Sequence, residues 1–243
     1  YSSIMIFFFF LKLIFIKAGR VGGSLFEVAL SKFAKNDDII TPIHREEVRA
    51  KMGFAKPQNF ENTLVDSFNV SKILFLKHLI GINKPRRFYN HMSAAEIKKK
   101  LGETLWEKSF KISIIRNPFD QLLSSYFRTL KKEFPKKIDF EEYYLSNPHM
   151  ISFNKNHYEI ENKVIIDFFI RYEYFEKDIK TLESKIPELK GLYEVFSNTY
   201  AAPYPGSRPK NINIRKFYEE FPKIRDMIEI QNASYIKKFN YSL

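Results

Sequence analysis

Residues 111–124 decide the fold, and they read Lys111-Ile-Ser-Ile-Ile-Arg116-Asn117-Pro118-Phe-Asp-Gln-Leu-Leu-Ser124. The apolar run before Arg116 is typical of a buried strand that ends at the arginine. Asn117 then begins a helix with proline at its first position, and Ser124 lies about two helical turns beyond Arg116. An arginine at the carboxyl end of a strand and a hydroxyl on the next helix can bind one phosphate from two directions. The alternative is an ordinary capped helix after a strand, with Arg116 in a salt bridge.

A second strand-to-helix turn lies near the N-terminus and reads Gly19-Arg20-Val21-Gly22-Gly23-Ser24. Residues 12–17 predict a strand before it, and the apolar spacing after it predicts a helix, which gives the first half of a βαβ unit. Glycines allow backbone N–H groups to point into one concavity at a helix N-terminus, a geometry that binds phosphate or sulfate. The turn lacks the Gly-Lys-Ser/Thr ending of a Walker A loop, and a turn without any ligand is the alternative.

The rest of the chain alternates further strands with further helices. The expected elements are a helix over 93–101 that begins at a Ser93/Glu96 capping box, a buried strand over 163–171, a helix over 173–186 and a final helical stretch over 217–239. Such alternation predicts an α/β fold of three layers, in which helices cover both faces of a mostly parallel sheet. We expect one domain over residues 1–243, with an insertion loop over 34–72; residues 72–80 are ambiguous.

The composition narrows the class of partner. The chain carries a formal net charge of +12, which favours anionic partners such as nucleotides, sulfated glycans, nucleic acid or anionic lipid. The abundance of Lys, Ile, Asn and Phe also fits an AT-rich genome without any selection for binding. The chain has no cysteine, which excludes disulfides and cysteine-ligated zinc, and its histidines lack metal-ligand spacing, so we expect no metal.

The apolar stretch over residues 4–16 bears on localisation. It is shorter than the roughly 20 residues that a membrane-spanning helix needs, and it has no small-residue cleavage site. We therefore expect one or two buried strands here rather than a membrane anchor or a signal peptide. The sequence fixes no compartment; we expect the cytoplasm, with a Golgi-type membrane anchor as the alternative for a chain truncated at its N-terminus.

Together the two turns resemble those of the sulfotransferases that use 3′-phosphoadenosine 5′-phosphosulfate (PAPS), in the bacterial-type branch related to carbohydrate sulfotransferases. In that family a strand–loop–helix that reads roughly Pro-Lys-x-x-Gly-Thr-Ser binds the 5′-phosphosulfate, and residues 19–24 fall on it. A later strand ends in Arg-[Asn/Asp]-Pro, with a serine eight residues after the arginine, and binds the 3′-phosphate. Here Arg116, Asn117, Pro118 and Ser124 match that second motif. The resemblance runs from about residue 12 to the end, and it implies a P-loop NTPase-like sulfotransferase fold.

The resemblance assigns residues to the nucleotide. The donor-binding set that it implies is Arg20, Val21, Gly22, Gly23, Ser24, Arg116 and Ser124, together with Arg208 and Lys210 in a late loop that closes over the 3′-phosphate. The alternative for the late loop is a solvated basic segment. Arg171 is a further candidate for anion contact, although an internal pair with Glu173 or Asp167 is favoured.

The resemblance also implies the catalytic residues Arg20, Lys17 and His91. The family usually has a lysine where this chain has Arg20, and an arginine can stabilise a leaving phosphate but does not donate a proton. Lys17 can take over if its side chain turns inward. His91 is the expected base for the acceptor proton, and a structural histidine is the alternative. Glu27 and His44 are weaker candidates for the base.

The expected reaction transfers the sulfuryl group of PAPS to an acceptor hydroxyl and releases adenosine 3′,5′-bisphosphate without a metal; the resemblance implies a carbohydrate acceptor. The expected partners are this nucleotide donor and a glycan or other hydroxyl compound, with no nucleic acid. One alternative is a kinase-like enzyme of nucleotide-dependent phosphoryl transfer, although the turn lacks its lysine. The other is a basic module without enzymatic activity that binds glycan or nucleic acid.

Overall fold

The computed structural model describes residues 5–44, 46–62, 71–80, 87–89, 92–133, 138–200, 209 and 212–243. These residues form an α/β fold, as the alternation of strands and helices predicts. The main sheet has five strands in the order β3-β1-β2-β4-β7. Their bounds are β1 (Met5–Phe8), β2 (Leu13–Ile16), β3 (Ile39–Ile40), β4 (Phe110–Ile115) and β7 (Phe168–Arg171).

The sheet is mixed, so the expectation of a mostly parallel sheet needs correction. β2 pairs with β4 and β4 pairs with β7 in parallel, whereas β1 is antiparallel to both of its neighbours, β2 and β3. The cause lies in the apolar stretch at the N-terminus, which folds back on itself as a hairpin rather than running on as one strand. The chain reverses between Phe8 and Leu13, where Lys12 has a positive φ of 48°.

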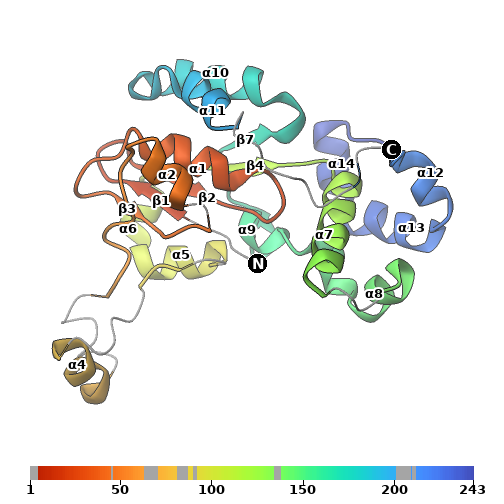
Figure 1. Ribbon diagram of the computed structural model, residues 1–243, viewed down its shortest axis with the longest axis horizontal. Coiled ribbons are helices and arrows are strands. Elements are labelled where there is room, and N and C mark those ends of the chain that lie inside the picture. Colours follow the sequence, from red (N-terminus) through yellow and green to blue (C-terminus); the bar gives the residue numbers. More distant parts are fainter. Residues whose placement is uncertain are drawn as a thin grey trace.

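Helices cover the sheet from two sides, which gives three layers (Figure 1). One side carries α1 (Gly23–Ser31), α2 (Glu46–Lys51), α10 (Phe175–Lys185) and α11 (Leu192–Tyr200), and the other carries α5 (Ala94–Leu101), α6 (Glu103–Glu107) and α9 (Lys155–Tyr158). The Phe26 ring on α1 stands edge-on to Phe15 of β2 at 5.1 Å and to Phe196 of α11 at 5.9 Å between ring centroids. Aromatic packing of this kind joins the sheet to its helical layer.

A group of helices with its own core lies beyond the carboxyl end of β4 (Figure 1). It comprises α7 (Pro118–Glu133), α8 (Phe140–Ser146), α12 (Ile214–Glu219), α13 (Pro222–Gln231) and α14 (Ala233–Phe239). The Phe140 ring is central to this core, because its centroid lies 5.0 Å from that of Tyr126 and 4.9 Å from those of Phe217 and Phe221. The predicted final helical stretch is therefore three helices, and Pro222 begins the second of them.

Two more sequence expectations change in the structure. Residues 163–171 do not form one strand, because β6 (Lys163–Val164) pairs with β5 (Glu159–Ile160) in a separate two-stranded sheet, and only β7 joins the main sheet. The predicted insertion loop contains β3 and α2, and the ambiguous residues after it form a helix, α4 (Lys72–Leu79), that stands apart from the body (Figure 1). Three short 3-10 helices complete the described elements: η1 (Pro148–Ser152), η2 (Tyr172–Tyr174) and η3 (Pro187–Leu189).

Within the described segments, every helix is too short or too polar to cross a membrane.

Candidate functional site

The Gly-rich turn connects the end of β2 to the start of α1. Gly22, which directly precedes α1, has φ 79° in the left-handed region. A Cβ atom at Gly22 would lie 3.2 Å from the Phe175 ring and 3.3 Å from the Tyr172 ring, so both the backbone and the packing favour glycine. Gly22 has no side chain with which to cap α1, so it offers the first-turn N–H groups no acceptor. The positive end of the helix dipole lies at the same place, and this geometry suits an anion.

Lys17 reaches the same turn from inside the protein. Its side chain is 4% exposed, and its Nζ donates a hydrogen bond to Ser24 Oγ at 2.8 Å. A Cβ atom at Gly23 would lie 2.7 Å from Lys17 Cγ, so glycine leaves the space through which the lysine stem passes. The Lys17 side chain therefore points inward and lies against the turn, which is the condition that the sequence analysis set for a role of Lys17.

Lys17 also lies next to a buried cluster of charged side chains. Glu27 on α1 is fully buried, and its carboxylate lies 3.8 Å from Lys17 Nζ and 3.2 Å from Arg49 Nη2 on α2. Arg49 Nη1 also pairs with Glu46 at 2.8 Å. Burial lowers the pKa of Lys17 to about 8 and raises the pKa of Glu27 to about 8, because desolvation outweighs their mutual attraction. Glu27 is therefore buried between two cations and does not face solvent. This corrects the expectation that Glu27 is a candidate base for the acceptor proton.

The side chain of Arg20 joins the two sequence motifs. Arg20 Nη2 donates hydrogen bonds to Ser124 Oγ at 2.9 Å and to the Ser124 carbonyl at 3.1 Å. Arg20 has a positive φ of 63°, and this backbone conformation belongs to the same turn. Residues 104 positions apart in the chain therefore meet at one place, as the pairing of the motifs predicts.

Arg116 also reaches the turn, but it is engaged in an ion pair. Its Nη1 donates to the carbonyl of Arg20 at 3.0 Å, while its Nε and Nη2 contact Asp120 Oδ2 at 2.6 and 2.5 Å. The ring centroid of Tyr172 lies 4.1 Å from the guanidinium carbon. The salt bridge is the alternative that the sequence left open, and it occurs here together with the predicted proximity of the two turns.

Two amide side chains that the sequence did not single out hold the start of the turn. Asn154 receives the Gly19 N–H at 2.8 Å and donates to the Gly19 carbonyl at 3.0 Å, and Gln121 donates to the same carbonyl at 2.7 Å. Gln121 lies one turn before Ser124 on α7, a spacing that was a usable signal; nothing in the local sequence marks Asn154. Val21 is buried in the main core, so it offers an anion only its backbone.

A small hollow opens beside the two amide side chains that contact Gly19. Arg116, Gln121 and Asn154 line it, together with the rings of Phe153 and Tyr158. Its size suits ordered water rather than a nucleotide. A ligand as large as a nucleotide would therefore lie over the turn and not inside this hollow.

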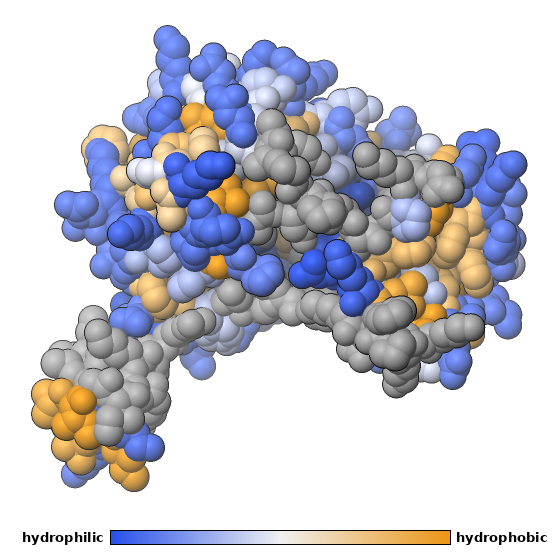
Figure 2. Space-filling model, viewed as in Figure 1, coloured by the Kyte–Doolittle hydropathy of each residue, from blue (hydrophilic) through white to orange (hydrophobic). Residues whose placement is uncertain are grey.

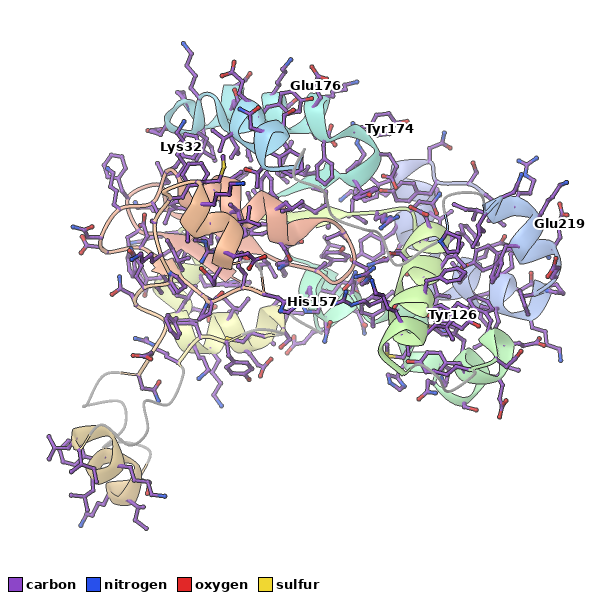
Figure 3. All side chains as sticks on the ribbon, viewed as in Figure 1. Lys32, Tyr126, His157, Tyr174, Glu176 and Glu219 are labelled. Carbon is purple, nitrogen blue, oxygen red and sulfur yellow. The ribbon has the colours of Figure 1, made fainter. Side chains whose placement is uncertain are left out.

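His157 lies close to Asn154 both in the sequence and in space. It is three residues after Asn154 on α9, and its backbone N–H donates to the Asn154 carbonyl at 2.9 Å. Figure 3 labels it at α9. Burial lowers the pKa of His157 to about 4, so the imidazole is neutral at neutral pH. No motif in the sequence singles out this histidine.

The carboxylates near the strand ends differ in their partners from the expectation. Arg171 makes a bidentate pair with Asp178, at 2.8 and 2.6 Å, rather than with Glu173 or Asp167. Asp167 instead accepts the backbone N–H of Lys111 at 2.7 Å. Glu173 accepts the backbone N–H of Asn117 at 2.7 Å, which satisfies a donor at the start of α7.

Three of the predicted site residues, His91, Arg208 and Lys210, lie outside the described residues. His44 is exposed just before α2. In the described part of the chain, no three His, Asp or Glu side chains are grouped so as to hold a metal ion.

A scan against protein-family models found no match, and searches of curated proteins and of solved structures found no similar protein. The function is therefore inferred from the geometry of this chain.

Proposed function

We propose that this chain is a PAPS-dependent sulfotransferase with a P-loop NTPase-like arrangement of β2, the Gly-rich turn and α1. The reaction transfers the sulfuryl group of PAPS to a hydroxyl of an acceptor, with a carbohydrate as the favoured class, and releases adenosine 3′,5′-bisphosphate. The observation that carries the proposal is the hydrogen bond from Arg20 to Ser124 Oγ at 2.9 Å, which brings the two anion-binding motifs together. Two phosphate sites this close suit a nucleotide that is phosphorylated at two positions.

The turn supplies the site for the phosphosulfate end. The N–H groups of Gly23 and Ser24 begin α1, where the helix dipole favours negative charge. Lys17 and Arg20 add two cations at the turn: Lys17 is buried and contacts Ser24, and Arg20 lies within the turn and contacts Ser124. Sulfuryl transfer places growing negative charge on the leaving phosphate, and fixed donors of this kind stabilise such charge.

Arg116 and Ser124 supply the site for the 3′-phosphate. The fit is incomplete in one respect, because Asp120 already occupies two donors of Arg116. A phosphate here has to displace the carboxylate or bind the remaining faces of Arg116 and Arg20. The ring of Tyr172 fixes the plane of the Arg116 guanidinium in either case.

In the acceptor half of the proposal, the acceptor oxygen bonds to sulfur while the sulfur–oxygen bond to the phosphate breaks. The acceptor proton passes to a base, and His91 keeps that role as part of the proposal. Lys17 can hold or release a proton at the leaving oxygen, because burial lowers its pKa to about 8.

The decisive experiment is a binding measurement on the full chain by calorimetry, with adenosine 3′,5′-bisphosphate, with ATP and magnesium, and with an oligonucleotide. The proposal expects binding of the bisphosphate in preference to the other two. Arg20→Ala should weaken it by about 10- to 100-fold, the value of one charge-assisted hydrogen bond. Arg225→Ala is the matched control, because Arg225 is an exposed arginine paired with Asp226 on α13. Preference for magnesium ATP would favour a kinase-like enzyme, and binding of the oligonucleotide alone would favour a basic binding module.

A further inference from the structure

The apolar surface of α4 is the largest feature that the proposed function leaves without a role. Ile73, Leu76, Leu79 and the following Ile80 are 56–66% exposed. Positions 73, 76 and 80 are spaced three and four residues apart, so they share one side of the helix, and position 79 lies next to them. Figure 2 shows an apolar patch over α4, set apart from the main body of the molecule. Grouped apolar exposure of this kind marks a binding surface.

The exposed apolar residue Ile230 is not part of such a group. Ile230 on α13 is 77% exposed, more than any residue of α4, but its neighbours in sequence are Glu229 and Gln231. An isolated apolar residue on a polar surface is common and needs no partner. Ile230 therefore serves as a reference for exposure without clustering.

The charged residues between Ser67 and Ala95 in the sequence all have one sign. From Ser67 to Ala95 the sequence contains no Asp or Glu. The same stretch contains the cations Lys72, Lys77, Lys84, Arg86 and Arg87. Lys72 and Lys77 are exposed on α4 itself, beside the apolar side chains. The occupant of this surface must accordingly be both apolar and negatively charged.

We propose that α4 is a docking element for the surface of an anionic lipid bilayer. Its apolar side chains enter the boundary between headgroups and acyl chains, and Lys72 and Lys77 contact the lipid phosphates. Basic residues beside an exposed apolar surface recognise anionic lipids in this way. A helix of eight residues is about 12 Å long, so it lies in the interface and does not cross it.

A second copy of the chain fits this surface less well. Packing α4 against α4 would bring four lysines together, and α4 has no carboxylate to offset them. A bilayer with anionic headgroups offers an apolar layer and negative charge at once. The docking of α4 is independent of the proposed sulfotransferase activity, because α4 contributes no residue to the Gly-rich turn or to α7.

The test is co-sedimentation of the full chain with vesicles of phosphatidylcholine alone and of phosphatidylcholine mixed with phosphatidylglycerol. We expect binding to the mixed vesicles that weakens as salt is added, and little binding to the neutral ones. Lys72→Gln with Lys77→Gln should lower the affinity by about tenfold or more. Leu76→Asp with Leu79→Asp should abolish binding, whereas the control Ile230→Asp should not change it. Since α4 stands apart from both cores, these variants should keep the wild-type far-UV circular dichroism.

Three results would overturn the proposal. One is equal binding to neutral and anionic vesicles, and another is equal loss of binding in the α4 variants and in the Ile230→Asp control. The third is a dimer, measured by light scattering, that only the α4 variants lose while none of the proteins binds vesicles. That result would assign the surface to a second copy of the chain.

Discussion

Replacement of Gly22 by alanine tests whether the turn at the start of α1 has the described geometry. The left-handed φ of 79° costs a residue with a side chain about 1–2 kcal/mol. The new Cβ atom would also lie 3.2 Å from the Phe175 ring and 3.3 Å from the Tyr172 ring, so one or both rings must move. We therefore expect a total loss of about 2–3 kcal/mol in the free energy of unfolding.

Gly53→Ala is the matched control for this change. Gly53 has φ 68°, so it imposes a similar backbone cost, but a Cβ atom there meets nothing within 4 Å. The control should lose only about 1–2 kcal/mol. The difference between the two variants, about 1 kcal/mol, measures the contact with the two rings.

Urea unfolding followed by fluorescence is a suitable assay, because the chain has one tryptophan, Trp106, and it is buried. The midpoint should shift without a change in the m-value if only stability changes. Tyr172 also stacks on Arg116, so Gly22→Ala should weaken binding of adenosine 3′,5′-bisphosphate while Gly53→Ala leaves it unchanged. A Gly22→Ala protein as stable as the Gly53→Ala protein would refute the packing of the turn against these rings.

Two further predictions concern buried ionisable groups. Glu27→Leu should destabilise the fold by about 2–3 kcal/mol in chemical denaturation, because it removes the buried group that lies beside Lys17 and accepts a hydrogen bond from Arg49; the control Glu176→Leu, at an exposed pair, should leave the midpoint unchanged. Burial lowers the pKa of His157 from 6.5 to about 4. Between these pH values the unfolded chain binds a proton that the folded chain does not. The free energy of unfolding, measured by chemical denaturation at a series of pH values, should therefore fall by up to about 3 kcal/mol as the pH drops from 6.5 to 4. His157→Gln should flatten this part of the stability profile relative to His44→Gln, a change at an exposed site, and an identical slope in both variants would contradict the burial of His157.

The sequence predicted the elements whose signals are local. The capping box is confirmed, since Ser93 accepts the Glu96 N–H and Glu96 accepts the Ser93 N–H. The strand that ends near Arg116 and the helix that begins at Pro118 are confirmed as β4 and α7. Caps, proline positions and apolar runs act over a few residues, so the chain carries them whatever the rest of the fold does.

The direction of β1 needed the whole fold. The apolar stretch over residues 4–16 allowed either one strand or two, and apolar periodicity does not encode the direction in which a strand pairs. The hairpin forms because both of its strands find neighbours, β3 on one side and β4 on the other. The mixed sheet follows from that long-range pairing.

The partners of the charged residues were also decided by tertiary structure. The sequence predicted that the turns of Arg20 and Ser124 lie at neighbouring strand ends. It did not predict the ion pairs of Arg116 with Asp120 and of Arg171 with Asp178, or the hydrogen bonds of Asn154 to Gly19. Ion pairs and side-chain hydrogen bonds are short-ranged. The Asn154 contact spans 135 positions of the chain, whereas Asp120 and Asp178 lie only four and seven positions from their arginines. The packing of the helices therefore decides which of these groups come within hydrogen-bond distance of each other. The glycine turn and the helix that follows it, by contrast, are specified by residues next to each other in the sequence.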